Sequence, residues 1–321
     1  MKVSPILKGL ATYVPGLYPF LQRRSVRHTI DADYCYGVWL KHLTLLAANG
    51  MHGLPASVAE LGPGGSLGVG LAALLSGAER YRAFDIVRYT NVDWNLKLFD
   101  DLVERFRARA PRPRRGWPDF DQHLDETLFP RHLLTDELME KALAPARIAA
   151  IREAVRHMDT TDPDAMIRYV VPWHDAKVLE PQTIDLLLSH AVLEHIDDLD
   201  TTYAASAEWI RPGGWMSHQI DFRSHGLTAE WNGQWKYSAR RWRLVRGRRP
   251  YLINRQPFGA HLSLAEGRGF SVRCALRSPR LDGISRNEVA AAFVQLPDED
   301  LFCSGGFFVA QRLPAQGDVP A

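Results

Sequence analysis

Residues 57–85 constrain the fold of this chain more than any other stretch, because they predict a strand, a tight turn and a helix in direct succession. Val58–Leu61 is a short apolar strand. Leu67–Leu75 places apolar residues at helical spacing, and Gly77 is positioned to end that helix. The turn between the strand and the helix consists of three glycines, Gly62, Gly64 and Gly65.

A second strand, Tyr81–Phe84, follows the helix and is closed by Asp85. An acid about twenty residues after a glycine turn is the usual partner of ribose hydroxyls in nucleotide-binding βαβ units. The dinucleotide pattern G-x-G-x-x-G would need its third glycine at position 67, where this chain has Leu67. Glu60, just before the first glycine, would repel a pyrophosphate seated at the helix N-terminus. The turn therefore favours a ligand with a cationic end and no phosphate.

The turn sequence Glu60-Leu-Gly62-Pro-Gly64 resembles the first motif of class I S-adenosylmethionine-dependent methyltransferases, E-x-G-x-G-x-G, with Ser66 in place of the third glycine. The resemblance implies S-adenosyl-L-methionine as the cofactor, which has an ammonium, a sulfonium and no phosphate. It also implies that Glu60 faces the ammonium and that Asp85 accepts hydrogen bonds from the ribose. The structural alternative is a glycine turn that packs a helix on a strand without any ligand.

The fourth predicted strand, Ile184–Ser189, runs into His190-Ala-Val-Leu-Glu-His195, which closely resembles the fourth motif of the same family. In this family an Asp-Ala pair after the third strand often binds adenine. Asp175 fits that place, and a loop aspartate that caps a turn fits it equally well. The resemblance thus implies a cofactor site that comprises Glu60, Gly62, Gly64, Gly65, Asp85, Asp175 and His190.

Two later β runs, 270–276 and 306–311, predict the antiparallel strand pair that distinguishes this fold from a dehydrogenase. We therefore expect an α/β fold, with a doubly wound, seven-stranded, mostly parallel sheet and an antiparallel last strand. Residues 1–54 are expected to form a helical N-terminal cap, and residues 55–321 the methyltransferase domain. A helical insertion at 107–165, between the second and third strands, is expected to contribute to the acceptor pocket.

Methyl transfer to a hydroxyl requires an aligned acceptor, exclusion of water and removal of a proton. The base should lie at the carboxyl ends of the fourth and fifth strands, close to the methyl group. The side chains at these ends predict a catalytic set of His190, His195, Asp221 and His225. An Asp–His pair suits an oriented base. Together with His218 it would also supply oxygen and nitrogen ligands for a metal, but no spacing fixes such a site and we expect none.

The segment 226–262 is unusually rich in aromatic and arginine side chains, and we expect it to hold the acceptor. Aromatic planes stack on sugar rings, amides bond to hydroxyls, and arginine suits phosphate or carboxylate groups. The predicted acceptor-binding residues are Trp231, Asn232, Trp235 and Arg240. The structural alternative is a solvated basic helix with buried tryptophans, and the alternative ligand is RNA.

A formal net charge of +2 over 321 residues, with no appended RNA-binding module, argues against a nucleic-acid partner. The three cysteines, Cys35, Cys274 and Cys303, lack a metal-binding spacing and are odd in number, which fits a reducing cytoplasm. No apolar run has the length of a membrane span. We expect residues 1–20 to pack on the domain as a strap, with peripheral contact to a membrane or a partner as the alternative.

Together these features predict an enzyme that methylates an oxygen of a sugar, a glycan or another polar small molecule. A methyltransferase of lipids or natural products would share the cofactor half and differ in the acceptor pocket. Leu67 and Glu60 disfavour a nicotinamide-dependent oxidoreductase. A non-catalytic binding protein of the same fold is the last alternative, and the oligomeric state is left open.

Overall fold

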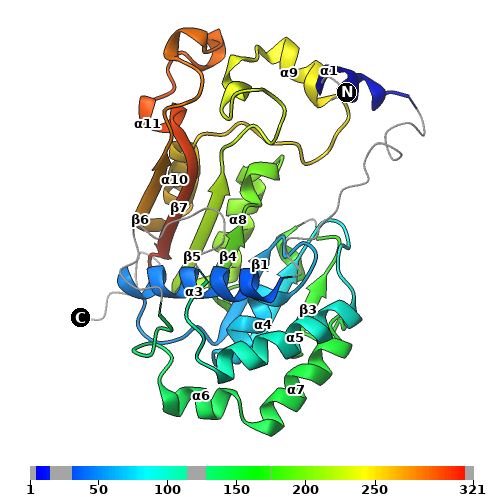
Figure 1. The fold of residues 1–321 in the computed structure, drawn as a ribbon, viewed down its shortest axis with the longest axis vertical. Helices are drawn as coiled ribbons and strands as arrows, with labels where there is room; N and C mark the ends of the chain where they lie inside the picture. The colour runs from blue at the N-terminus through cyan, green and yellow to red at the C-terminus, as the bar shows by residue number, and fades with distance from the viewer. Residues whose placement is uncertain (1–4, 15–30, 114–127, 174, 315–321) are drawn as a thin grey trace.

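The computed structural model describes residues 5–14, 31–113, 128–173 and 175–314, and its centre is one seven-stranded sheet of order β3-β2-β1-β4-β5-β7-β6 (Figure 1). All neighbouring strands from β3 to β5 pair in parallel, whereas β7 is antiparallel to both β5 and β6. This confirms the predicted sheet with its antiparallel last strand. The strands are β1 (Ser57–Leu61), β2 (Arg80–Phe84), β3 (Ile167–Val170), β4 (Ile184–His190), β5 (Ile210–Asp221), β6 (Phe270–Pro279) and β7 (Cys303–Arg312).

Helices cover both faces of the sheet, as a doubly wound fold requires. One face carries α3 (Ala32–Ala48), α4 (Gly68–Leu75) and α5 (Val92–Arg107). The other carries α8 (Leu199–Trp209) and α10 (Phe258–Gly267). Side chains alternate along β4, so that Leu186 and Leu188 pack under the first group of helices and Leu187 under the second.

Residues Arg211–Gly214 form an irregularity within β5. Pairing between β4 and β5 passes from Ile184 opposite Ile210 to Leu186 opposite Trp215, so residues 211–214 loop out between the two pairs. Gly213 adopts a φ of +77°, which a residue with a side chain rarely adopts. After this loop β5 continues without interruption to Asp221, the residue that it delivers to the carboxyl edge.

The described part of the N-terminal region contains two helices. The side chain of Asp31 caps α3, and the helix ends at Asn49, followed by Gly50 at a φ of +101°. Within the predicted cap, residues 1–54, this helix covers residues 32–48, and residues 1–4 and 15–30 lie outside the described part of the chain. The second helix is α1 (Pro5–Ala11).

The described part of the insertion forms α6 (Asp136–Ala142) and α7 (Pro145–Arg156). Arg147 on α7 donates hydrogen bonds to the carbonyls of Leu74 and Ala78, which end α4 and lead into β2. These residues lie at the amino edge of the parallel strands, and α6 lies far from the carboxyl ends in Figure 1. The start of α7 thus lies away from the expected pocket, whereas Asp159, just beyond α7, pairs at 2.6 Å with Arg88, which follows β2. The contribution of the insertion to the acceptor pocket stays a prediction.

A second, smaller layer stands beyond the carboxyl ends of β4 and β5, and we call it the upper module (residues 222–257 and 280–302). It contains α9 (Ala239–Arg246), on which α1 packs so closely that a Cβ on Gly9 would lie 1.9 Å from the carbonyl oxygen of Leu244. Within the predicted N-terminal strap, the described helix α1 thus packs on this module (Figure 1). The remaining short elements are η3 (Ala176–Val178), η4 (Leu193–His195), η5 (Gly233–Lys236), η6 (Arg286–Glu288), η7 (Ala291–Phe293) and α11 (Asp298–Leu301).

None of the helices in the described part of the chain combines the length and the apolar character that crossing a membrane requires.

Candidate functional site

The glycine turn after β1 has the backbone geometry that its sequence predicts. Gly62 and Gly64 adopt φ angles of +65° and +70°, in the left-handed region. The amide of Gly62 donates to the carbonyl of Phe84 at 2.8 Å, which holds the turn to the end of β2. A Cβ on Gly62 would lie 2.7 Å from both methyl groups of Val192, in the loop after β4. The turn thus packs directly against the β4 loop.

Asp85 lies at the end of β2 and supports the same turn. Its Oδ2 accepts a hydrogen bond from the amide of Gly64 at 3.3 Å, and its Oδ1 accepts from the amide of Ile86 at 2.8 Å. Burial raises the pKa of Asp85, although these backbone donors act in the opposite direction. The carboxylate therefore lies where the turn and β2 meet, the place predicted for contacts to a ribose.

Glu60, the acid before the turn, is buried between β1 and its neighbours. Its Oε2 accepts a hydrogen bond of 2.5 Å from the Tyr81 hydroxyl on β2, and only 4% of the residue is exposed. Burial raises the pKa of Glu60 to about 7, while the hydrogen bond from Tyr81 opposes that rise. The carboxylate therefore already has a protein partner, and its predicted role toward a cofactor ammonium stays a prediction.

Ser66 stands where the family motif has its third glycine, beside Gly65, and it has a structural role at the start of α4. Its Oγ accepts a hydrogen bond from the amide of Gly68 at 3.2 Å. The amide of Leu67 donates to Oδ1 of the buried Asn95 at 2.8 Å. Two amides at the helix start are thus satisfied by side chains, which explains why a serine is accommodated at this position.

Asp175 caps the short turn η3, since its Oδ1 accepts from the amide of Lys177 at 2.8 Å. The turn is close to the end of β2, because the amide of Trp173 donates to the carbonyl of Asp85 at 3.2 Å. Asp175 is exposed and performs the capping role that the sequence offered as an alternative. A contact with adenine stays a prediction.

His190 ends β4 and is contacted from α3. Its Nδ1 lies 3.3 Å from Nε2 of His42, whose Nδ1 lies 2.7 Å from Oγ of Ser217. The ring of Tyr34 meets His190 edge-on at a centroid distance of 5.8 Å. Burial, with His190 nearby, lowers the pKa of His42 well below its usual value, so His42 is a neutral link between Ser217 and His190.

The turn η4 positions Glu194 and His195 just beyond β4, and a distant segment fixes it. Asn254 donates from Nδ2 to the carbonyls of Leu193 and Ile196, at 2.7 and 2.9 Å. The backbone amide of Asn254 donates to the carbonyl of Glu194 at 2.7 Å. These three bonds clamp η4 against residues 251–254 of the upper module.

His195 and His225 are each oriented by a backbone carbonyl. Nδ1 of His195 bonds to the carbonyl of Tyr251 at 3.0 Å, and Nδ1 of His225 bonds to the carbonyl of Arg223 at 2.9 Å. His225 and Tyr251 both have a positive φ, near +50° and +56°. Such backbone is uncommon for residues other than glycine and often accompanies functional sites.

Asp221, the last residue of β5, lies next to His225. Its Oδ2 is 3.3 Å from Nε2 of His225 and 2.9 Å from a guanidinium nitrogen of Arg223. Burial opposes ionisation of Asp221, but the hydrogen bonds from His225 and Arg223 outweigh it, so its pKa lies below its usual value. The predicted pairing of Asp221 with His225 is therefore present in the structure.

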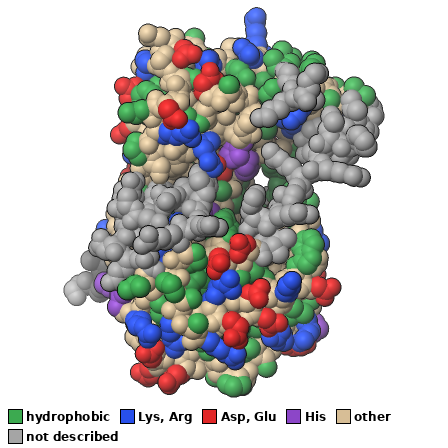
Figure 2. Space-filling view, in the orientation of Figure 1, with side chains coloured by type: hydrophobic (Ala, Val, Ile, Leu, Met, Phe, Trp, Pro, Cys, Tyr) green, Lys and Arg blue, Asp and Glu red, His purple; other side chains and the backbone are tan. Residues whose placement is uncertain are grey.

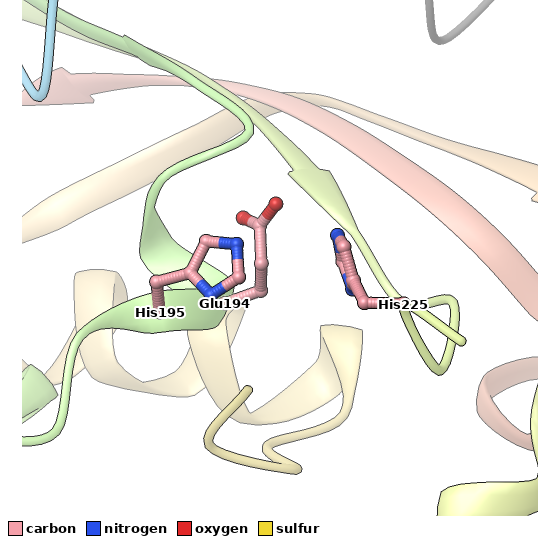
Figure 3. A group of neighbouring side chains, drawn as sticks. All are labelled: Glu194, His195 and His225. Carbon is pink, nitrogen blue, oxygen red and sulfur yellow. The ribbon is translucent and has the colours of Figure 1, made fainter. Parts of the chain in front are cut away.

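The structure brings Glu194, His195 and His225 together, with ligand atoms all within 4.8 Å of one another (Figure 3). Glu194 is 3% exposed, and neither of its carboxylate oxygens has a hydrogen-bond partner. Burial, with Asp221 nearby, raises its pKa well above the usual value. On the face in Figure 2 the molecule is hollowed between its upper and lower parts, and histidine and charged side chains show at the rim of the hollow.

His218 does not join this group. It lies on the other face of β5, where its Nδ1 is 2.8 Å from Oγ of Ser189 and its ring meets that of Tyr203. Burial lowers the pKa of His218 to about 3. The alternative metal set that included His218 is therefore wrong, because the side-chain alternation of a strand separates it from Asp221.

The predicted acceptor residues of the aromatic segment are mostly core. Trp231 and Asn232 are 8% and 0% exposed. Nδ2 of Asn232 donates to the carbonyl of Leu301, and its Oδ1 accepts from the backbone amide of Ile284. Trp235 is 1% exposed and packs on Phe293. Trp231 and Asn232 therefore belong to the interior of the upper module and do not present a surface to an acceptor. Trp235 also lines a small cavity with Glu194 and Asp221, and its acceptor role stays a prediction. Arg240 is exposed on α9, and its role stays a prediction.

Glu194 and Asn254 are the site residues that the sequence alone did not single out. Glu194 lies inside the fourth motif, directly before His195, and its acidic side chain next to a histidine was the one sign of a site residue there. Asn254 offered no such signal, because its partners in η4 lie about sixty residues earlier.

No protein-family model and no curated protein sequence matches the chain. Among solved structures it is similar to a Galdieria sulphuraria protein with a provisional assignment as a sarcosine dimethylglycine methyltransferase, at 12% identity and a TM-score of 0.45, over 86% of this chain and 85% of that one. It is also similar to phosphoethanolamine N-methyltransferase 2 of Haemonchus contortus, at 15% identity and a TM-score of 0.43, over 92% of this chain and 60% of that one.

A third similar structure is an S-adenosylmethionine-dependent methyltransferase from Mesorhizobium loti, at 14% identity and a TM-score of 0.40, over 84% of this chain and 96% of that one. All three TM-scores are below 0.5, so the fold assignment rests on the strand order and strand directions of this chain.

Proposed function

We propose that this chain is an S-adenosylmethionine-dependent methyltransferase that acts on an oxygen of a polar small molecule. One observation carries the proposal: the glycine turn after β1 packs against the loop after β4 that carries the polar cluster. Val192, two residues before Glu194, packs against Gly62 of the turn. A ligand held on the turn would therefore lie next to the acid and histidine side chains at the ends of β4 and β5.

The residues of the turn fit the proposed cofactor. A side chain at Gly62 would meet Val192, and the positive φ angles of Gly62 and Gly64 favour glycine at both positions. Because glycine has no side chain, a ligand can approach the backbone of the turn. Asp85 is the acceptor for ribose hydroxyls, and it would exchange its long 3.3 Å bond with Gly64 for those contacts. The cofactor itself supplies an electrophilic methyl group on a sulfonium.

The acceptor end contains the predicted catalytic set His190, His195, Asp221 and His225. A hydroxyl acceptor must lose a proton as its oxygen attacks, and the sheet edge offers imidazole and carboxylate groups for that purpose. A neutral histidine whose Nδ1 donates to a carbonyl, as in His195, presents the lone pair of Nε2. The polarity of this cluster supports a polar acceptor and disfavours a lipid or an apolar natural product.

The glycan form of the proposal loses the support of Trp231, which is buried in the upper module. A nicotinamide-dependent oxidoreductase is disfavoured by the acid at Glu60 and by the antiparallel β7. A non-catalytic binding protein remains the rival, and methyl-transfer activity separates it from the enzyme. The cytoplasmic location and the absence of a nucleic-acid partner stay predictions.

Calorimetric titration with S-adenosylhomocysteine tests the cofactor half of the proposal. We expect wild-type protein to bind it and Asp85→Asn to bind at least about tenfold more weakly, since a charged hydrogen-bond partner is lost. Asp93→Asn is the matched control, because Asp93 lies in the first turn of α5 and has no predicted ligand role. No binding by the wild type, or equal binding by Asp85→Asn, would contradict the assignment. NADH binding at the same site would favour the oxidoreductase.

A further inference from the structure

We propose that Glu194, His195 and His225 form a binding site for one divalent transition-metal ion at the carboxyl ends of β4 and β5. The three side chains come from η4 and from the loop after β5, and they point toward a common space in Figure 3. Their nearest ligand atoms all lie within 4.8 Å of one another. Two opposite metal–ligand bonds of about 2.1 Å span about 4.2 Å, so small side-chain rotations bring the three groups onto one ion.

Both histidines are held in the orientation that a metal ligand needs. Nδ1 of His195 is bonded to the carbonyl of Tyr251, and Nδ1 of His225 to that of Arg223. A carbonyl only accepts, so each Nδ1 carries the hydrogen and Nε2 is the nitrogen left for an ion. Nε2 of His225 lies 3.3 Å from Oδ2 of Asp221, so a bound ion would take the place of that contact. Histidine ligands of metal sites in proteins are fixed in the same way, by donation from the second ring nitrogen to a carbonyl or carboxylate.

Glu194 supplies the independent observation that points to a cation. The residue is 3% exposed, and neither carboxylate oxygen has a partner at normal hydrogen-bond geometry. The backbone amides of Glu194 and Asp221 lie near enough to lower its pKa, but burial outweighs them. A buried carboxylate without a partner is costly, and proteins satisfy such groups with hydrogen bonds, counter-ions or metals. The nearest acid, Asp221, is already paired with Arg223 at 2.9 Å and does not relieve Glu194. A metal ion between Glu194 and the two imidazoles would supply the positive charge that this carboxylate lacks.

The donor set selects the class of ion. Two imidazoles and one carboxylate suit zinc, cobalt, iron or manganese, whereas magnesium and calcium prefer oxygen ligands. Three protein ligands leave coordination positions open, as in catalytic sites and unlike closed structural sites. His225 is exposed, which gives an ion access from solvent. If the proposed function holds, an open position would take the acceptor oxygen and lower the pKa of its hydroxyl.

Titration of the untagged protein with cobalt(II) after dialysis against a chelator tests the site without any measurement of activity. We expect one cobalt ion per chain, with the strong visible absorption of four- or five-coordinate cobalt, and displacement by zinc. His225→Asn and Glu194→Gln should weaken binding by at least about tenfold, because each removes one of three ligands. His157→Asn is the matched control, since Nε2 of His157 lies 2.8 Å from Glu153 in an exposed histidine–carboxylate pair on another face.

Equal cobalt binding by wild type and His225→Asn, or no stoichiometric binding by the wild type, would overturn the proposal. Thermal melting of each variant in the presence of chelator shows whether the fold is intact. If Glu194→Gln does not fold, His225→Asn still tests the site, because His225 is exposed. S-adenosylhomocysteine titration of the same samples reports separately on the proposed function, because the metal ligands lie outside the glycine turn. If the protein binds cobalt but not S-adenosylhomocysteine, the proposed function is refuted and the proposed metal site stands.

Discussion

The hydroxyl of Tyr81 donates a 2.5 Å hydrogen bond to Oε2 of Glu60, and this bond joins β2 to β1 directly beneath the glycine turn. Both side chains are buried, so the bond stabilises the ionised carboxylate where water does not reach it. Tyr81→Phe should therefore destabilise the protein by about 1–3 kcal/mol at pH 8. The loss should be smaller at pH 5, where Glu60 is protonated. Urea unfolding at the two pH values measures the difference, and an equal loss at both would contradict it.

Glu60 should also make the stability of the wild type fall as the pH rises. Its pKa in the folded protein is about 7, above its usual value of 4.5. Between these values the unfolded chain loses the proton first, so the folded state binds more protons and stability declines with rising pH. Below 4.5 both states are protonated, and above 7 both are ionised.

Glu60→Gln should remove this decline. We expect the stability of the wild type relative to Glu60→Gln to fall by on the order of 1–3 kcal/mol between pH 4.5 and pH 7 and to stay level above pH 7. Chemical unfolding of both proteins across this range provides the measurement. Parallel stability curves for the two proteins would show that Glu60 titrates normally.

Gly70 on α4 should tolerate no side chain. A Cβ at this position would lie 2.0 Å from the ring of Tyr81, so helix and strand would have to separate. Gly70→Ala is expected to cost about 1–3 kcal/mol in spite of the better helix propensity of alanine. Gly267 in α10 is the matched control, since a Cβ there meets nothing within 4 Å. Gly267→Ala should leave the melting temperature unchanged or raise it, and a similar loss in both variants would contradict the packing argument.

Asn254→Ala should loosen the turn that carries Glu194 and His195. The substitution removes the side-chain bonds to the carbonyls of Leu193 and Ile196, with an expected cost of about 1–2 kcal/mol. Hydrogen exchange of residues 192–196 should accelerate in the variant while exchange in β4 stays slow. Asn49→Ala, which removes one bond to Leu45 at the end of α3, is the control and should leave η4 unaffected. Unchanged exchange in η4 would show that Asn254 is not its clamp.

Local sequence patterns predicted the sheet because they follow from short-range physics. The alternating and continuous apolar runs identified the seven strands, and the positive φ angles of Gly62 and Gly64 required glycine. The histidines and Asp221 were predicted together because the carboxyl ends of neighbouring parallel strands meet at one edge. The contact of His225 with Asp221 follows from their spacing of four residues across a turn.

Residues whose role depends on distant partners were predicted poorly. Trp231 and Trp235 have the composition of a sugar site, but packing against residues 280–302 buries them, and no local pattern indicates that partner. Glu60 was predicted from its charge alone, whereas its bond to Tyr81 depends on the register of β1 and β2. The metal set with His218 paired residues that are close in sequence and lie on opposite faces of one strand.

The reversed direction of β7 determines at which edge of the sheet residues 280–302, which connect β6 to β7, must lie. Because β6 runs with β5 and β7 runs against it, the chain leaves β6 and re-enters β7 at the same edge, over Asp221. Residues 280–302 therefore form a hairpin-like excursion, and Ile284, Leu296 and Leu301 within it pack with Trp235. Trp235 in turn lines a small cavity with Glu194 and Asp221. A change in the length of this excursion would thus act on that cavity through Trp235, while the strands beneath keep their pairing.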